Sequence, residues 1–217
     1  MNNTKWVFRE LEGAGFEGPN SGSGDHFKGT KLSSLVRELV QNSMDQITKK
    51  KETVKIVMDL KKVSAKSFNG FYGIWPHVDA CHSYQKTLNK NNNTWQLRYK
   101  NSLDEYRNNE DVSILCFHDS NTTGLNGPID GTPKGPFHAI KAQGLSAKQG
   151  EGSGGSYGHG AVAALLYSGV RGVFYYSQVD EEPKERFFGK VILQSHKHPH
   201  LEGNPYTRSF GYYGHDD

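Results

Sequence analysis

The stretch RELVQNSMDQ, residues 37–46, carries the pattern on which the fold prediction depends. Apolar residues around it recur at helical spacing, so residues 31–49 are predicted to form a helix. Because a helix turns about 100° per residue, Glu38, Asn42 and Asp45 fall within about 60° of one another. A carboxylate can take a proton from water, and an amide oxygen one turn away can bind Mg²⁺. The same spacing is also typical of an ordinary solvent-facing stripe, so this motif alone leaves both interpretations open.

A second candidate motif is ILCFHDSNTTGL, residues 114–125. Residues 112–117 are predicted to form a buried strand, which delivers Asp119 at its end and is followed by a polar turn and Gly124. A carboxylate at the bottom of a pocket there could accept a hydrogen bond from an exocyclic amine such as that of adenine. The alternative is an aspartate that caps its own turn, which is a common role.

The third motif is GSGGSYGHGAVAALL, residues 152–166, in which glycines run directly into an apolar helical pattern. Gly155, Gly158 and Gly160 follow a G-x-x-G-x-G spacing before the predicted helix 158–167. Backbone N–H groups can approach a ligand closely at glycine, and a helix N-terminus favours anions, so phosphate binding is indicated. The alternative is a flexible linker, although linkers rarely continue as AVAALL.

The remaining elements mix helices and strands without a regular βαβ alternation. Strands are predicted at 6–9, 54–60, 172–179 and 186–193, and helices at 78–88 and 97–107 within a polar insertion, 61–111. This mixture favours an α+β layered sandwich over a doubly wound parallel sheet. We expect Trp75 and Trp95 in the insertion to be packing anchors rather than ligand-stacking residues.

Composition limits the class of protein. A chain of 217 residues with 34% hydrophobic residues and a net charge of +3 is expected to be a single domain, 1–217. Two cysteines cannot form a disulfide framework, and no apolar run approaches the roughly 20 residues that span a bilayer. We therefore expect a cytoplasmic protein without membrane contact. DNA binding is compatible with the mild basicity but is not indicated by it.

The histidines in SHKHPHLEG, residues 195–203, offer a separate interpretation. Alternation in an extended segment would place His196, His198 and His200 on one side, where imidazoles could bind a metal ion. Pro199 and the nearby end of the sequence favour a solvated tail instead.

Taken together and in this order, the three motifs resemble the signature boxes of the GHKL ATPases, the superfamily of gyrase, heat-shock chaperones of the ninety-kilodalton class, sensor histidine kinases and MutL. Residues 37–46 look like the N box with its E-x-x-x-N core, Asp119 looks like the aspartate of the D-x-G-x-G box, and GGSYGHGAVA looks like the glycine-lid box. The middle box departs from the pattern, since Asn121 stands where the first glycine is expected and Gly124 comes one residue late. The resemblance covers about 31–60 and 111–193.

The resemblance implies a Bergerat fold, a two-layer α/β sandwich in which a mixed β-sheet carries helices on one face, with a mobile lid at about 120–160. It implies ATP and Mg²⁺ as cofactors, with Glu38 as the catalytic base for the attacking water and Asn42 as the Mg²⁺ ligand. Asp119 would receive the adenine amine, and the glycines would surround the β- and γ-phosphates. The nucleotide-binding residues expected in this way are Asn42, Asp45, Asp119, Gly124, Gly155, Ser156, Tyr157, Gly158, His159 and Gly160.

The function implied is ATP binding and hydrolysis in which lid closure drives a conformational change or dimerisation. Glu38 at the hydrolytic position, and the lack of a preceding phospho-acceptor helix, oppose the kinase branch. Hydrolysing members usually receive a lysine from a following domain, so we expect slow turnover by this unit and an N-terminal position in a larger protein. A homodimer or protein partner is expected through regions outside this chain. A role in DNA handling or anti-phage defence, a chaperone-like ATPase and a non-hydrolysing ATP-gated binding module stay open as alternatives.

Overall fold

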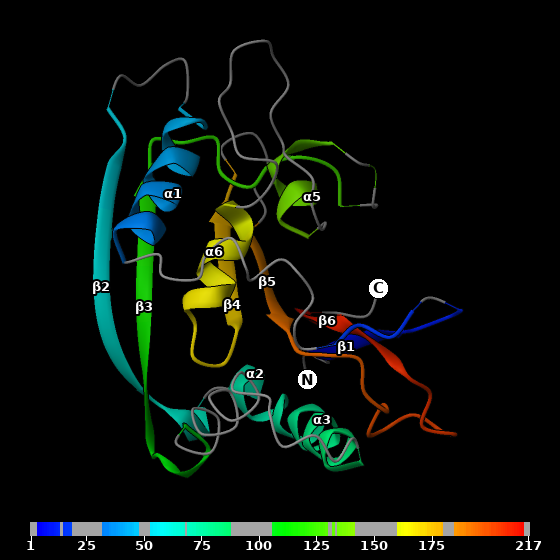
Figure 1. The fold of residues 1–217 in the computed structure, drawn as a ribbon. Helices are drawn as coiled ribbons and strands as arrows, with labels where there is room; N and C mark the ends of the chain where they lie inside the picture. Colours follow the sequence, from blue (N-terminus) through cyan, green and yellow to red (C-terminus); the bar gives the residue numbers. More distant parts are fainter. Residues whose placement is uncertain are drawn as a thin grey trace.

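The computed structural model describes residues 4–13, 15–18, 32–47, 53–67, 69–87, 106–129, 132, 134–141, 160–179 and 185–214. These residues form a mixed α/β structure with one four-stranded and one two-stranded sheet (Figure 1). Every strand pairing among them is antiparallel, which differs from the mixed sheet expected. No helix in this described part is both long and apolar enough to cross a bilayer.

The four-stranded sheet joins the two ends of the chain. Its order is β1-β6-β5-β4, with bounds Lys5–Glu10 for β1, Thr207–Gly214 for β6, Glu185–Ile192 for β5 and Gly172–Gln178 for β4. The prediction of a solvated tail at 195–203 is wrong, because Ser195 and His196 are fully buried and the chain continues into β6. In the segment Thr207–Gly214 the more buried positions alternate, as a paired strand requires.

The two-stranded sheet consists of β2, Lys55–Ser64, and β3, Asp111–Ser120, paired over their full length. Strand β3 extends beyond the predicted 112–117, so Asp119 lies within the strand instead of following it. Ile56 on β2 is its direct partner. The predicted strand 54–60 is correct at its start and continues four residues further.

The described part of the segment between these two strands contributes to the core. It contains the short helices η2, Ala65–Ser67, and α2, Asn69–Tyr72, and the longer helix α3, Trp75–Thr87. Helix α3 confirms a helix near the predicted 78–88, while most of 97–107 falls outside the described residues. Trp75 packs in the core as a structural anchor, as expected; the core cluster includes Trp6, Phe8, Phe71, Ile74, Trp75, Val78, Cys81, Val112, Val191, Leu193 and Tyr213.

Helices contact both faces of the four-stranded sheet. Helix α5, Gly135–Lys141, meets the face of Lys190, whose Nζ donates a hydrogen bond to the carbonyl oxygen of Ile140 at 2.8 Å. Helix α3 meets the opposite face, where His77 stacks on Phe8 with ring centroids 4.3 Å apart. Successive residues of a strand point to opposite faces, and Phe8 lies in the row of Val191, next to Lys190. The expectation of helices on one face therefore does not describe α3 and α5.

Two further helices carry most of the first motif and the end of the third motif. Helix α1, Leu32–Met44, falls inside the predicted 31–49, and α6, Gly160–Tyr167, begins two residues after the predicted start. The two helices pack against each other, and Ala163 and Leu165 of α6 are completely buried. This packing brings the first and third sequence motifs together (Figure 1).

Candidate functional site

Helix α1 presents the polar stripe predicted from the sequence. Leu35 and Ser43 are its buried residues, Glu38 is half-buried, and Asn42 is exposed. Asp45 follows the last residue of the helix, and its Oδ1 accepts a hydrogen bond from Gln41 Nε2 at 3.0 Å. The half-buried carboxylate and the exposed amide thus lie one helical turn apart.

The C-terminal end of α1 is tied to the turn that follows β3. The Thr123 N–H donates to the carbonyl oxygen of Gln46 at 2.8 Å, and Thr123 Oγ1 donates to Gln46 Oε1 at 2.8 Å. Ile47 and Thr122 form an isolated antiparallel bridge in the same place. The region of Asp119 is therefore attached directly to the helix that carries Asn42.

The turn of the middle motif has a left-handed backbone at Asn121. Asn121 adopts a φ of +67°, and among residues with a side chain asparagine tolerates this left-handed region best. Its Nδ2 donates to the carbonyl oxygen of Thr53 at 2.8 Å. The asparagine at this position is thus compatible with the turn.

Both the backbone conformation at position 124 and the lack of room for a Cβ atom require glycine there. Its φ is +66°, and a Cβ there would lie 2.7 Å from Ser177 Oγ and 3.0 Å from the carbonyl oxygen of Gln178. The next residue is held from both sides, because the Leu125 N–H donates to Ser177 Oγ and Arg186 Nη1 donates to the Leu125 carbonyl oxygen, each at 2.8 Å. Strands β4 and β5 thereby fix the turn that follows Asp119.

The glycine-rich motif is described only where it enters α6. Gly160 is the first residue of that helix. Outside the described residues lie Gly155, Ser156, Tyr157, Gly158 and His159. The position of α6 against α1 nevertheless places the end of this motif beside the helix that carries Glu38.

Asp119 differs from the expectation in its surroundings. Its side chain is exposed, whereas the sequence suggested a carboxylate at the bottom of a pocket. The reason is that β2 and β3 continue as a pair to Lys55 and Ser120, so Asp119 lies near the end of a two-stranded extension. The structure thus brings the neighbourhoods of Asp119, Asn42 and Gly160 together without enclosing Asp119.

One buried cation at the end of α5 was missed by the sequence reasoning. Lys190 is 2% exposed, and its Nζ donates to the carbonyl oxygens of Ile140 at 2.8 Å and Lys141 at 3.3 Å. The hydroxyl of Tyr212 donates to the same Lys141 oxygen. Burial lowers the pKa of Lys190 to about 8. Its signal in the sequence is a single lysine inside the apolar strand FFGKVIL, and its Nζ lies at the end of α5.

Histidines form a second polar cluster, on α3 and on the segment after β5. His77 Nδ1 and His196 Nε2 are 2.9 Å apart, and His196 Nδ1 is 2.8 Å from the carbonyl oxygen of Gln194. Because a carbonyl only accepts, His196 carries its proton on Nδ1 and accepts at Nε2 from His77. Burial lowers the pKa of His77 to about 2 and that of His196 to about 4, so both rings are neutral at pH 7.

This cluster does not support the metal-site interpretation. Over the residues that the structure describes, no group of three or more histidine, cysteine, aspartate or glutamate side chains is placed to hold a metal ion. The His196 side chain is fully buried and hydrogen-bonded. Phe8 packs edge-on to it, with ring centroids 5.0 Å apart. His77, His196 and His198 are therefore buried, whereas His200 is exposed.

Comparison with known proteins gives no further assignment: no family model matches the chain, and neither a curated protein nor a solved structure matches it.

Proposed function

We propose that this chain binds Mg–ATP in the manner of the GHKL ATPases and hydrolyses it slowly. The geometry that supports the proposal is the meeting of three motifs that lie far apart in the sequence. Helix α1 packs on α6, where the glycine-rich motif ends, and its last turn is hydrogen-bonded to the turn after Asp119 through Gln46 and Thr123. A solvent-facing stripe, a turn aspartate and a linker would have no reason to converge in this way.

In this proposal each motif contributes one part of the site. Glu38 orients and deprotonates the attacking water, and Asn42 binds the Mg²⁺ that bridges the phosphates. Asp119 accepts the adenine amine, and its exposure means that the nucleotide itself would complete its surroundings. Backbone N–H groups from Gly155 to Gly160 would bind the phosphates, since a glycine-rich segment that enters a helix offers several donors to an anion.

The Bergerat arrangement is part of this proposal. Helices α1 and α6 would form the helix layer, with the nucleotide between that layer and the lid, and the two sheets would form the other layer. Helices α2 and α3 would then be an addition on the opposite face.

Isothermal titration calorimetry with a non-hydrolysable ATP analogue, with and without Mg²⁺, tests the binding step. We expect binding that Mg²⁺ strengthens, and we expect Asn42→Ala to remove most of that strengthening because the metal loses its amide ligand. Absence of heat with adenine nucleotides in the wild-type chain would refute the proposal.

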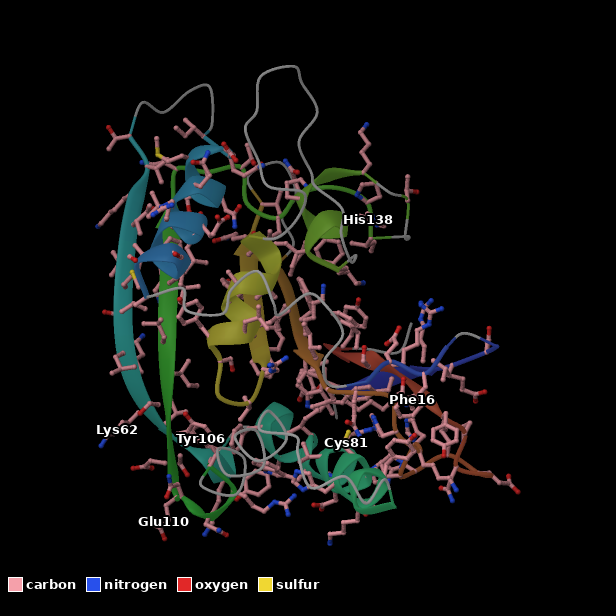
Figure 2. All side chains as sticks on the ribbon, viewed as in Figure 1. Phe16, Lys62, Cys81, Tyr106, Glu110 and His138 are labelled. Atoms are coloured by element: carbon pink, nitrogen blue, oxygen red, sulfur yellow. The ribbon has the colours of Figure 1, made fainter. Side chains whose placement is uncertain are left out.

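Steady-state turnover tests the catalytic step. We expect Glu38→Ala to abolish hydrolysis and leave analogue binding intact, because the base acts on water and does not hold the nucleotide. Glu110→Gln is the matched control, since Glu110 is an exposed carboxylate at the far end of the β2–β3 pair (Figure 2). Binding without turnover in the wild-type chain would instead favour an ATP-gated binding module.

A further inference from the structure

Strand β2 has an outer edge and an exposed apolar surface that the proposed nucleotide site does not use. Among the described residues β2 pairs with β3 only, and it forms the outer border of the molecule in Figure 1. Leu60 is 74% exposed, and its direct partner on β3, Leu115, is 45% exposed. Met58, on the same face as Leu60, is also exposed. An edge strand of ten residues with unpaired backbone groups and apolar side chains is a template for pairing with another strand.

We propose that β2 pairs with β2 of a second copy of this chain, antiparallel and centred on Leu60, to form a symmetric dimer. A twofold axis perpendicular to the sheet keeps the same face of both copies on the same side. Two residues that lie opposite each other must then both be even-numbered or both be odd-numbered, and this restricts the possible registers. The charge pattern of KIVMDLKKVS selects one of them.

Pairing centred on Leu60 opposes Asp59 of each copy to Lys61 of the other, so two opposite-charge pairs form. The neighbouring symmetric registers are unfavourable, because centring on Asp59 would oppose Asp59 to its own copy and centring on Lys61 would oppose two lysines. Centring on Met58 would oppose Lys55 to Lys61. Centring on Val57 would also oppose Lys55 to Asp59, but it would pair only residues 55–59 of the strand, whereas the Leu60 register pairs residues 56–64. Among the registers that pair most of β2, the Leu60 register places unlike charges opposite each other without opposing like charges.

The same register extends the apolar surface across four strands. Leu60 pairs with Leu115 within each copy, so the row would read Leu115, Leu60, Leu60 and Leu115 on one face of the joined sheet. Val57 of each copy would lie opposite Val63 of the other. Lysines on an edge strand usually discourage pairing. Here Lys61 would gain a carboxylate partner, and Lys62, which points away from the body of the molecule, would lie opposite Met58 (Figure 2).

Sedimentation equilibrium without nucleotide tests the dimer independently of the proposed ATPase function. One strand pair buries less than the roughly 1,600 Å² of a standard interface, so we expect a reversible dimer with a micromolar dissociation constant. We expect Leu60→Lys to abolish the dimer, because it places two ammonium groups at the symmetry axis. Ile129→Lys is the matched control, since Ile129 is 71% exposed outside β2 and should leave the dimer unchanged.

A charge exchange tests the register. Asp59→Lys and Lys61→Asp should each raise the dissociation constant about tenfold or more, because each creates two like-charge contacts. The double variant should restore the wild-type value, because the pairs reform with reversed polarity. A wild-type chain that stays monomeric up to roughly 1 mM, a dimer insensitive to Leu60→Lys, or a double variant without recovery would overturn the proposal.

Discussion

The two halves of the molecule are held together in different ways. Around α1, β3 and α6 the two helices pack through buried aliphatic side chains, hydrogen bonds such as those of Thr123 with Gln46 join the turns, and the proposed functional side chains are exposed or half-buried. Around β1, β6 and α3 the contacts are aromatic and imidazole rings packed without solvent, with Phe8 stacked on His77 and Trp6 donating to the Gly70 carbonyl oxygen at 2.5 Å.

This difference separates stability from function. Buried aromatic contacts contribute most of the free energy that holds a small domain together, whereas turns tied by single hydrogen bonds can rearrange at low cost. We infer that the aromatic and imidazole half is the stable frame and that the motif-bearing half is the part a nucleotide would reorganise.

The largest expected effect is acid destabilisation through the imidazole pair. In the folded chain the pKa of His77 is about 2 and that of His196 about 4, against 6.5 in the unfolded chain. Below pH 6.5 the unfolded state therefore binds more protons, and the free energy of unfolding falls by up to about 1.4 kcal/mol per pH unit for each ring. Urea denaturation from pH 7 to about 5, above the range in which most carboxylates titrate, measures this loss.

A variant at His77 assigns the acid effect to this pair. His77→Asn keeps a donor near the position of Nδ1 but does not titrate, so the slope of stability against pH should fall by about half. The titratable groups that face the pair are His198 and His200, which are unchanged in the variant. An unfolding free energy that does not vary with pH in the wild-type chain would show that the imidazoles are not the frame we infer.

The two halves also differ in how far the sequence predicts them. The motif half was largely predictable, because α1 and α6 show helical periodicity and the glycines signal turns. In the core half β1 and α3 were predicted as elements, but strand β6, the sheet pairing and the burial of α3 were not. Strand β6 contains two glycines and pairs with β1, about 200 residues earlier, and no local pattern indicates a contact at that separation. Helix α3 was foreseen as a helix, but its polar composition gave no sign that it buries His77 and Cys81.

The candidate site shows the same limit at the level of single residues. The i, i+4 spacing of Glu38 and Asn42 fixes their relation on one helix, and the structure keeps it. The exposure of Asp119 and the burial of Lys190 depend on which strands pair and what covers them, and these are tertiary properties. Sequence alone therefore indicated which residue types to examine but not their solvation.

A smaller effect is expected in the motif half from Gly124→Ala. The new Cβ would clash with Ser177 Oγ and the Gln178 carbonyl oxygen at a φ of +66°, so we expect a loss of about 1–3 kcal/mol in unfolding free energy. Gly203→Ala is the matched control, because Gly203 has a φ of +74° but nothing within 4 Å of a Cβ. The control isolates backbone strain, which costs roughly 1–2 kcal/mol.

Analogue binding by the same variants extends the comparison. Gly124→Ala should weaken nucleotide binding, because the turn after Asp119 must shift away from Ser177, whereas Gly203→Ala should leave affinity unchanged. Equal effects of both variants on affinity would mean that the Gly124 turn has no special connection to the proposed site.

The smallest effect is expected on the surface of the core half, from Asp79→Asn. Asp79 Oδ1 and Arg107 Nη2 are 2.8 Å apart in an exposed ion pair, and such pairs contribute at most about 1 kcal/mol.

Arg107 also lies over the ring of Trp75, 4.8 Å from its centroid. Arg107→Ala should therefore cost about 0.5–1 kcal/mol more than Asp79→Asn, because it removes the cation–π contact as well. Thermal denaturation at low and high salt separates the two contributions. Salt screens the exposed ion pair between Arg107 and Asp79, and it affects the contact of Arg107 with the buried Trp75 ring much less. A loss above about 2 kcal/mol for Asp79→Asn would show that the surface of α3, and not only its buried rings, holds the frame together.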